Sequence, residues 1–320
     1  MNNPPPRDFV SIIIPNWNGG LYLRGSIRSA LSQDYELFEV IVVDDGSTDG
    51  SVEAASNEFE RIRVVSQARQ GAAAARNRGL DEARGRFIVF LDSDDQLLPT
   101  YLSSQVKFSK TLSNDMLSVC DRVYMNSDLT ETLRREQLLP LKVGESSVSQ
   151  VVRQIIQTSS PMHRREALDK VGGFDPTLKQ GQERDLHLRL ALAGYSFVRN
   201  PFVGLKIREH DSSGRISNQQ FARSSPFHDL DRINREYQRI VDGMGANIER
   251  RIIETIAKRY WAGGRRCIRA GRLAEAEIYF DAARSCGVQD YLWGGWVYRA
   301  LCRMFGPVRA ERLRLTRFHR

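Results

Sequence analysis

The chain has 320 residues, enough for two domains or for one large domain with an appendage. Its 41% hydrophobic and 27% charged residues are typical of a soluble protein, and no apolar run reaches the roughly 20 residues of a membrane span. Residues 216–320 hold 20 Lys and Arg against 11 Asp and Glu, which leaves residues 1–215 with a net charge of −1 out of the total of +8. An electrostatic case for binding nucleic acid or an acidic membrane therefore exists only for the C-terminal third.

The cysteines and the N-terminus predict an intracellular protein. Cys120, Cys267, Cys286 and Cys302 lack the C-x-x-C or Cys/His spacing of a zinc site, so we expect reduced thiols. The first eight residues contain no apolar signal region. We therefore expect a cytoplasmic protein.

Apolar runs alternate with helical segments over the first hundred residues. The runs predict buried strands over residues 10–14, 40–43, 62–65 and 87–91. The segments between them predict helices over residues 18–31, 51–59 and 71–84. This alternation predicts a parallel sheet with helices on its faces.

Three carboxylates follow the fourth strand, at Asp92, Asp94 and Asp95. Folding alone does not call for three mutually repelling acids there, and a hard divalent cation would neutralise them together with substrate phosphates. The alternative is a polar turn in which Asp95 caps the next helix. Polar residues also follow the first strand (15–18) and the second (44–45), and ligands bind where parallel strands end. This coincidence favours a metal site.

Two common nucleotide-binding motifs are missing from the sequence. No G-x-G-x-x-G follows the first strand and no G-x-x-x-x-G-K-[ST] occurs, which argues against a dinucleotide-binding Rossmann protein and a P-loop NTPase. Acidic residues at the strand ends, together with a cation, instead suggest that a nucleoside diphosphate binds without a glycine-rich phosphate-binding loop.

The remaining residues predict a looser succession of elements. Helices are expected over residues 101–112, 148–157, 164–171 and 183–191, and strands over residues 116–125, 159–163, 195–198 and 203–207. Residues 126–147 are expected to form a polar loop. Residues 216–320 predict helices only, including a hairpin at 260–287 that resembles one tetratricopeptide-like pair.

Five motifs, in this order, resemble those of the family 2 glycosyltransferases, the large inverting group with the GT-A fold. They are V-S-I-I-I-P-N-W-N (10–18), V-V-D-D-G-S-T-D (42–49), G followed by A-R-N-R-G (71–79), F-L-D-S-D-D (90–95) and G-G-F-D (172–175). The resemblance covers about residues 8–213. It implies an α/β catalytic domain over residues 1–215, with a Rossmann-like, mixed and mainly parallel sheet flanked by helices. A basic, all-helical region over residues 216–320 would follow.

The resemblance implies a nucleotide-sugar site built from the strand ends. Its residues would be Pro15, Asn18, Asp44, Asp45, Arg76, Asp92 and Ser93. The acid pair after the second strand would contact base and ribose, and Arg76 would lie near the phosphates, where a guanidinium is well suited. The alternatives are a turn-forming Asp-Gly and an ordinary exposed helix arginine.

Asp92 and Asp94 resemble the family's D-x-D pair and imply a site for Mn²⁺ or Mg²⁺. Asp94 would be the direct ligand, and Asp92 would reach the ribose or the metal. The cation would bridge the diphosphate and stabilise its departing charge. His210 matches the family's late Arg-x-His pattern near the metal, the alternative being an exposed loop histidine.

The predicted catalytic base departs from the family pattern. The family shows Glu-Asp-x-Asp-Leu where this chain has Q-E-R-D-L at residues 182–186, which places Glu183 at the base position. Glutamate can take a proton from a hydroxyl, but its carboxylate lies one methylene farther out, and general bases depend on reach. Asp185 is the rival base, and a helix N-terminal acid without a catalytic role is the third alternative.

The end of the chain is aromatic and basic. Seven arginines and one acid occur from Arg299 to Arg320. Residues 292–320 therefore predict an interfacial helix on an anionic membrane, the alternative being a helix packed on the catalytic domain with a solvated basic tail. Nucleic acid is not an expected partner, because stacking and groove-reading motifs are missing.

Together these features predict a metal-dependent, inverting glycosyltransferase in surface polysaccharide or glycoconjugate synthesis. It would move one hexosyl or N-acetylhexosaminyl group from a nucleotide sugar, preferably a UDP-sugar, to a hydroxyl of a glycan or lipid-linked acceptor. The Gln-x-x-Arg-Trp motif of processive synthases is missing, so a single transfer is expected. The alternatives are a non-catalytic sugar-nucleotide-binding or scaffolding protein and a nucleotidyltransferase. We expect the protein in the cytoplasm, peripheral at the inner face of the cell membrane.

Overall fold

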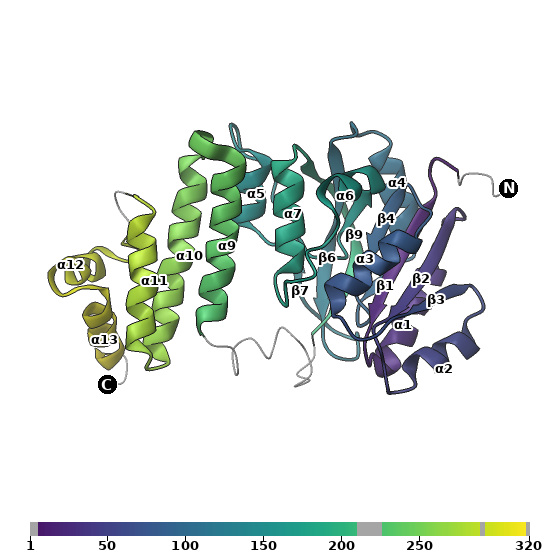
Figure 1. The fold of residues 1–320 in the computed structure, drawn as a ribbon, viewed down its shortest axis with the longest axis horizontal. Coiled ribbons are helices and arrows are strands. Elements are labelled where there is room, and N and C mark those ends of the chain that lie inside the picture. The colour runs from purple at the N-terminus through teal and green to yellow at the C-terminus, as the bar shows by residue number, and fades with distance from the viewer. Residues whose placement is uncertain (1–5, 210–225, 289–291, 318–320) are drawn as a thin grey trace. The chain divides into compact units, whose positions relative to one another are not determined.

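The structure is a computed structural model that describes residues 6–209, 226–288 and 292–317, with only the backbone of 226–228 and 315–317. The chain divides into two compact units, Met1–Ser212 and Ser213–Arg320, and each is described by itself (Figure 1). The described residues of the first unit form a mixed α/β domain, and those of the second form helices.

A nine-stranded sheet organises the first unit, in the order β3-β2-β1-β4-β8-β6-β9-β5, with β7 paired to β6. Its first four strands are parallel: β3 (Ile62–Ser66), β2 (Phe38–Asp44), β1 (Val10–Asn16) and β4 (Phe87–Phe90). The others are β8 (Pro161–Arg164), β6 (Met116–Met125), β9 (Ser196–Arg208), β5 (Gln96–Leu97) and β7 (Thr132–Glu136). Of these, β6 and β9 pair in parallel, and the remaining pairings are antiparallel. The prediction of a mixed, mainly parallel sheet is confirmed.

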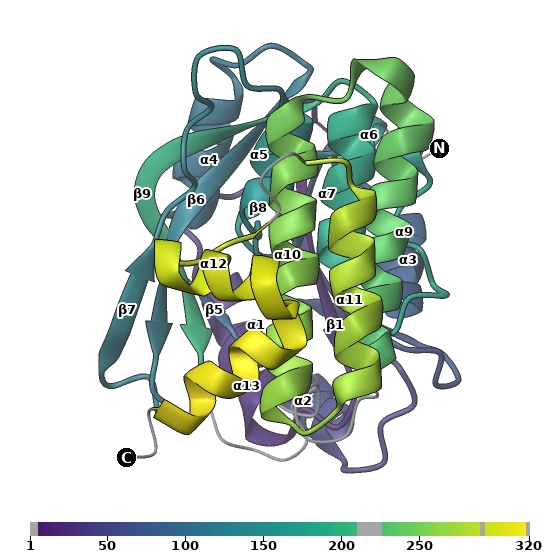
Figure 2. The same ribbon diagram turned by 90° about the vertical axis from the view of Figure 1, so that its left-hand side faces the viewer.

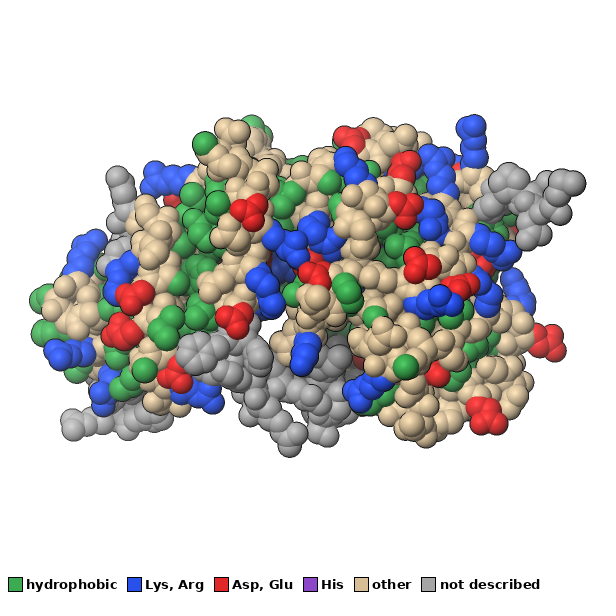
Figure 3. Space-filling view, in the orientation of Figure 1, with side chains coloured by type: hydrophobic (Ala, Val, Ile, Leu, Met, Phe, Trp, Pro, Cys, Tyr) green, Lys and Arg blue, Asp and Glu red, His purple; other side chains and the backbone are tan. Residues whose placement is uncertain are grey.

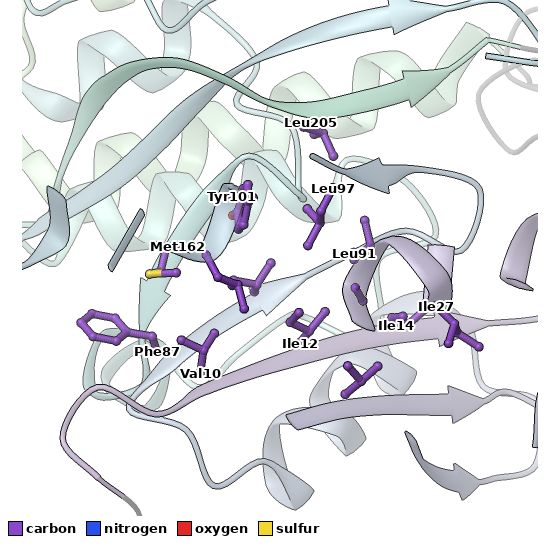
Figure 4. Close-up of a cluster of buried hydrophobic side chains, with 14 of the residues drawn as sticks. Val10, Ile12, Ile14, Ile27, Phe87, Leu91, Leu97, Tyr101, Met162 and Leu205 are labelled. Atoms are coloured by element: carbon purple, nitrogen blue, oxygen red, sulfur yellow. The ribbon is translucent and has the colours of Figure 1, made fainter. Parts of the chain in front are cut away.

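Alternate residues of the parallel strands enter two different helical layers, as the strand period of two requires. Ile12 and Ile14 belong to the cluster of Figure 4, together with side chains of α1 (Gly20–Leu31), α2 (Ser51–Glu58) and α4 (Tyr101–Ser109). Ile13 faces the other layer. There α3 (Ala72–Glu82) packs so closely that a Cβ on Gly79 would lie 2.3 Å from the Ile13 side chain. Burial on both faces explains why these strands are continuously apolar.

Three strands differ from the prediction. β9 is one strand where two were expected, because a bulge absorbs residues 201–202 between the pairs Cys120–Asn200 and Asp121–Val203. β7 lies inside the predicted loop of residues 126–147. Its residues are mostly exposed, so no apolar pattern marked it. β5 has two residues, too few for periodicity to detect.

The helices that follow β7 are close to their predicted positions. They are α5 (Ser147–Arg153), α6 (Arg165–Val171) and α7 (Gln182–Leu192). α6 ends at Gly172, which adopts the left-handed conformation of a helix C-terminus. α7 begins after Gly181, which is also left-handed.

The second unit contains α9 (Pro226–Met244), η1 (Gly245–Asn247), α10 (Arg250–Arg269), α11 (Leu273–Ser285), α12 (Trp296–Phe305) and α13 (Pro307–Arg317). Glycine lets α10 and α11 approach closely, since a Cβ on Gly263 would lie 2.3 Å from the Tyr279 ring. This pair is the hairpin predicted at residues 260–287, with an earlier start. Figure 2 shows α12 and α13 across one side of α10 and α11. Within the described residues, no helix combines the length and apolarity needed to span a membrane.

Candidate active site

The carboxyl ends of β1, β2 and β4 meet at one edge of the sheet. Asn16 pairs with Asp44, and Ile13 pairs with Phe90, so the residues that follow these strands emerge side by side. The three polar turns predicted from the sequence therefore lie together, at the edge where parallel sheets bind ligands.

The two acids of the second turn have different surroundings. Asp45 is buried, and its carboxylate accepts hydrogen bonds from the backbone N–H groups of Gln70 (2.8 Å) and Gly71 (2.7 Å), which lead into α3. Asp44 is half-buried and accepts the N–H of Ser47 at 3.0 Å, closing the Asp-Gly turn. Asp45 thus shapes the edge of the site, and Asp44 is the more accessible carboxylate.

Asn18 joins the first turn to the second. It adopts a φ of 51°, and its Oδ1 accepts the N–H of Thr48 at 2.8 Å, while its own N–H donates to Ser47 Oγ at 3.0 Å. Asparagine tolerates this left-handed conformation better than most residues. Pro15 is buried in β1, beyond the last pair with β4, where a missing N–H is tolerated. Both residues fix the shape of the turn.

Trp17 is a candidate that our motif-based prediction missed. Its side chain is 43% exposed at the end of β1, and the Arg69 guanidinium carbon lies 3.5 Å from the ring centroid. This cation–π contact holds an aromatic surface at the sheet edge. The available signal was a tryptophan placed directly after a buried strand, inside the predicted binding turn.

Arg76 connects the two ends of the candidate site. From α3 its buried guanidinium donates to Asp92 Oδ1 at 2.6 Å and to Gln182 Oε1 at 2.9 Å. It lies 5.2 Å from the ring centroid of Phe174. The alternative of an exposed helix arginine is therefore wrong. Because Gln182 opens α7, one side chain spans from the acidic turn to the helix that carries the predicted base.

Asn77 fixes the loop beside this arginine. It donates to the carbonyl of Phe174 at 2.7 Å and accepts the N–H of the same residue at 2.8 Å. Gly173 precedes Phe174 with a φ of 65°, and a Cβ there would lie 2.6 Å from Asn77 Oδ1. Two of the sequence motifs, at residues 71–79 and 172–175, are thus one structural unit.

The turn after β4 is anchored to the end of β9. Asp95 is buried and accepts the N–H of Arg208 at 3.1 Å, and Arg208 Nε donates to the carbonyl of Asp94 at 3.1 Å. Asp95 does not cap the next helix, since the N-cap of α4 is Thr100. The Asp92 side chain is 24% exposed, so the first acid of the D-x-D pair is reachable from solvent.

The acids of this turn fit a cation that arrives together with a nucleotide. One oxygen of Asp92 is bound to Arg76, and the described parts of the chain hold no group of three or more His, Cys, Asp or Glu suited to a metal. Asp94 and Ser93 are half-buried beside it, and His210 lies outside the described residues. One or two carboxylates plus substrate phosphates are the usual Mg²⁺ set, so these residues suit a hard cation without a preformed cage.

Glu183 and Asp185 share the first turn of α7 but differ in their partners. Asp185 accepts from Arg189 Nε at 2.8 Å, and both side chains are largely buried. Glu183 is half-buried, and no described residue forms a hydrogen bond or an ion pair with its carboxylate. Of the two candidate bases, Glu183 is therefore the one that remains available to a substrate proton.

Two buried histidines pack behind the site. His163 of β8 and His187 of α7 stack with their ring centroids 5.7 Å apart. Burial lowers the pKa of His163 to about 4. Burial, together with the nearby His163, holds the pKa of His187 well below its ordinary value. Both rings are therefore neutral at pH 7 and serve as packing groups between sheet and helix.

The sheet edge thus gathers an acidic turn and a buried arginine that bonds to the first residue of α7. Comparison with known families specifies the class. The model of glycosyl transferase family 2 matches residues 11–172, half of the chain, and the chain belongs to this family. The family assignment gives no support to the nucleotidyltransferase alternative.

Curated relatives agree with the assignment. An uncharacterized glycosyltransferase of Haemophilus influenzae is 43% identical over 152 residues, which cover 45% of this chain and 59% of the relative. A cholesterol galactosyltransferase of Borreliella burgdorferi is 34% identical over 134 residues, covering 41% of this chain and 37% of the relative. The chain thus spans less than two thirds of the length of each of these relatives.

Solved structures show the same fold. TarS of S. aureus in complex with UDP-GlcNAc superposes with a TM-score of 0.69 at 16% identity, covering 95% of this chain and 89% of that chain. The mannosyltransferase PcManGT of Pyrobaculum calidifontis, in complex with GDP-Man and Mn²⁺, gives 0.50 at 19% identity, covering 97% and 86%. The first unit has the GT-A fold, as the resemblance implied.

Proposed function

We propose that the chain is a metal-dependent, inverting glycosyltransferase that moves one sugar from a nucleotide sugar to a hydroxyl of a glycan or lipid-linked acceptor. The observation that supports this most directly is the Arg76 bridge, which ties Asp92 of the acidic turn to Gln182, the neighbour of Glu183. This bridge ties the start of α7, the helix that carries Glu183, to the acidic turn, and a transfer reaction needs its reacting groups held in place.

The donor's nucleoside would bind at the ends of β1 and β2. Asp44 can accept a hydrogen bond from the imide N–H of uracil or from a ribose hydroxyl, and Trp17 offers an aromatic face for the base. We favour a UDP-sugar that carries a hexosyl or N-acetylhexosaminyl group. The TarS complex with UDP-GlcNAc and the mannosyltransferase complex with GDP-Man fit a nucleotide-sugar donor.

The transfer would proceed by direct displacement. Glu183 takes the proton of the acceptor hydroxyl, the resulting oxygen attacks the anomeric carbon, and the bond from that carbon to the diphosphate oxygen breaks with its electron pair. Attack from the side opposite the leaving group inverts the configuration. Asp92 and Asp94 would hold Mn²⁺ or Mg²⁺. The cation would neutralise the negative charge that develops on the departing diphosphate.

The proposal also includes the acceptor and the cellular setting. A glycan or lipid-linked acceptor places the enzyme in surface polysaccharide or glycoconjugate synthesis. All four cysteines are free and buried, which suits the reducing cytoplasm.

A panel of nucleotide sugars incubated with the chain and Mn²⁺ tests the proposal. We expect one donor to release its nucleoside diphosphate, and a chelator to stop the release. Asp94→Asn should lower the rate at least about 100-fold, because the cation loses its direct ligand. The matched control is Asp115→Asn, which changes an exposed carboxylate directly before the start of β6. This variant should keep full activity. Turnover of no donor with any divalent metal would contradict the proposal.

A further inference from the structure

α12 presents large apolar side chains to solvent. Trp296 is 77% exposed, Met304 is 65% exposed and Phe305 is 49% exposed. Trp296 and Met304 are eight residues apart, so they lie on one side of the helix. Soluble proteins rarely expose such a group without a partner, and surfaces of this kind mark protein or membrane contacts.

The inner side of α12 is firmly packed, so the exposed side is a fixed outer surface. Tyr298 and Cys302 are buried. The Tyr298 ring lies 6.5 Å from the ring of Trp261 and 5.4 Å from the guanidinium of Arg265, both on α10. Arg265 in turn binds both carboxylate oxygens of Glu311 on α13, each at 3.1 Å. The helix pair is thus held against α10 through its other side.

The charge of this surface is positive. Arg303, Arg309 and Arg312 are exposed. Glu311 is the only acid between residues 299 and 320, and it is buried in its pair with Arg265. The outer side of α12 and α13 therefore combines apolar and cationic groups without an acid among its described residues. Figure 3 shows hydrophobic and basic side chains together over this end of the second unit.

We propose that α12 and α13 dock the chain on an anionic lipid surface. Trp296 and Met304 would enter the boundary between headgroups and acyl chains, and the arginines would lie among the phosphates. A second copy of the chain is a poorer fit, because the same arginines would face one another. The contact is independent of the transfer reaction, since lipid binding requires neither donor nor metal.

The two kinds of group should contribute separately to binding. Each arginine near an anionic surface strengthens attraction about fivefold, and this contribution is screened by salt. The apolar side chains contribute by burial and are insensitive to salt. Binding should therefore need anionic lipid and weaken as salt rises.

Co-sedimentation of the full chain with vesicles tests the proposal. One set is phosphatidylcholine alone, and the other contains one-third phosphatidylglycerol. We expect binding to the anionic vesicles to exceed binding to the neutral ones at least about tenfold. Trp296→Glu with Met304→Glu should reduce it at least about tenfold, because both acids would face the lipid. Arg309→Gln with Arg312→Gln should also reduce it, and only at low salt.

Val143→Glu is the matched control, since it replaces a fully exposed apolar residue of the first unit with the same charge. It should leave vesicle binding unchanged, and all variants should melt at the wild-type temperature because the positions are exposed. Equal binding to neutral vesicles, or full binding by the Trp296→Glu, Met304→Glu variant, would overturn the proposal. Absence of vesicle binding together with a dimer that this variant dissociates would assign the surface to a second copy instead.

Discussion

Arg76 shows how much of the site depends on a single buried side chain. It bonds Asp92 and Gln182, which are separated from it by 16 and 106 residues. Pairs this distant leave no periodic trace in a sequence. The motif therefore indicated an arginine near the donor, whereas its bond to α7, the helix of the proposed base, became visible only in the fold.

Replacement of Arg76 by methionine should uncouple the two ends of the site. The Asp92 carboxylate and the Gln182 amide would lose their donor, and the free energy of unfolding should fall by about 2 kcal/mol, in the range of hydrogen bonds to a charged group. Turnover should fall at least about 100-fold, since misplaced groups lose that much. Urea unfolding and donor turnover measure the two effects. Arg78→Met, on the exposed side of the same helix, should change neither appreciably.

Asp185→Asn should separate the rival bases. The substitution removes one charge from the pair with Arg189 and leaves Glu183 untouched. We expect a loss of about 2 kcal/mol in the free energy of unfolding, in the range of a hydrogen bond to a charged group. We also expect less than about a fivefold change in kcat, because in the proposed mechanism Glu183 takes the proton. A loss of kcat of about 1,000-fold with normal stability would instead make Asp185 the base.

Acid should destabilise the first unit through its buried histidines. Because burial lowers the pKa of His163 to about 4, the unfolded chain, with a histidine pKa near 6.5, takes up the proton first as the pH falls. The free energy of unfolding should therefore drop by roughly 3 kcal/mol for this residue between these two values. Urea titrations across that range measure the slope. His163→Leu should flatten the dependence of the free energy of unfolding on pH. An unchanged slope in this variant would contradict a lowered pKa of His163 as its cause.

Among the strands, the apolar runs of the sequence predict the central parallel ones, whereas β7 and the full length of β9 depend on pairing with other strands. β1, β2 and β4 are continuously apolar because both faces of the sheet are covered, and the sequence predicted all three. β7 is stabilised by pairing with β6, and β9 continues through a bulge at Pro201. Neither feature changes the local pattern of hydrophobicity. The polar strand ends were predictable for the same reason as the strands, since they follow them directly.

Gly79→Ala should loosen the contact between α3 and β1. The added Cβ would lie 2.3 Å from the Ile13 side chain, so the helix must shift. Overpacking costs about 1–3 kcal/mol, which exceeds the roughly 1 kcal/mol that alanine gains in a helix. We expect a net destabilisation of about 1 kcal/mol in urea unfolding. Arg78→Ala, the exposed neighbour, should cost about 0.5 kcal/mol or less.

At the scale of the whole molecule, donor and metal should bind as a pair. The described residues hold no group of three or more His, Cys, Asp or Glu suited to a metal, so Mn²⁺ alone should bind weakly. With Mn²⁺ at saturation, UDP at 100 times its own dissociation constant should raise the free energy of unfolding by about 2.7 kcal/mol. Thermal melting with Mn²⁺ alone, UDP alone, both, and both with a chelator measures the coupling. Equal stabilisation by Mn²⁺ alone would contradict a site completed by phosphates.

In the proposed mechanism, Glu183 takes the acceptor proton during transfer from a nucleotide sugar bound at the acidic turn. The most direct measurement compares Glu183→Gln with the wild-type chain for both donor binding by calorimetry and sugar transfer. We expect unchanged donor affinity in Mn²⁺ and a loss of turnover of about 100-fold to 10,000-fold, the range that general base catalysis supplies. Full turnover by Glu183→Gln, with donor still bound, would contradict it.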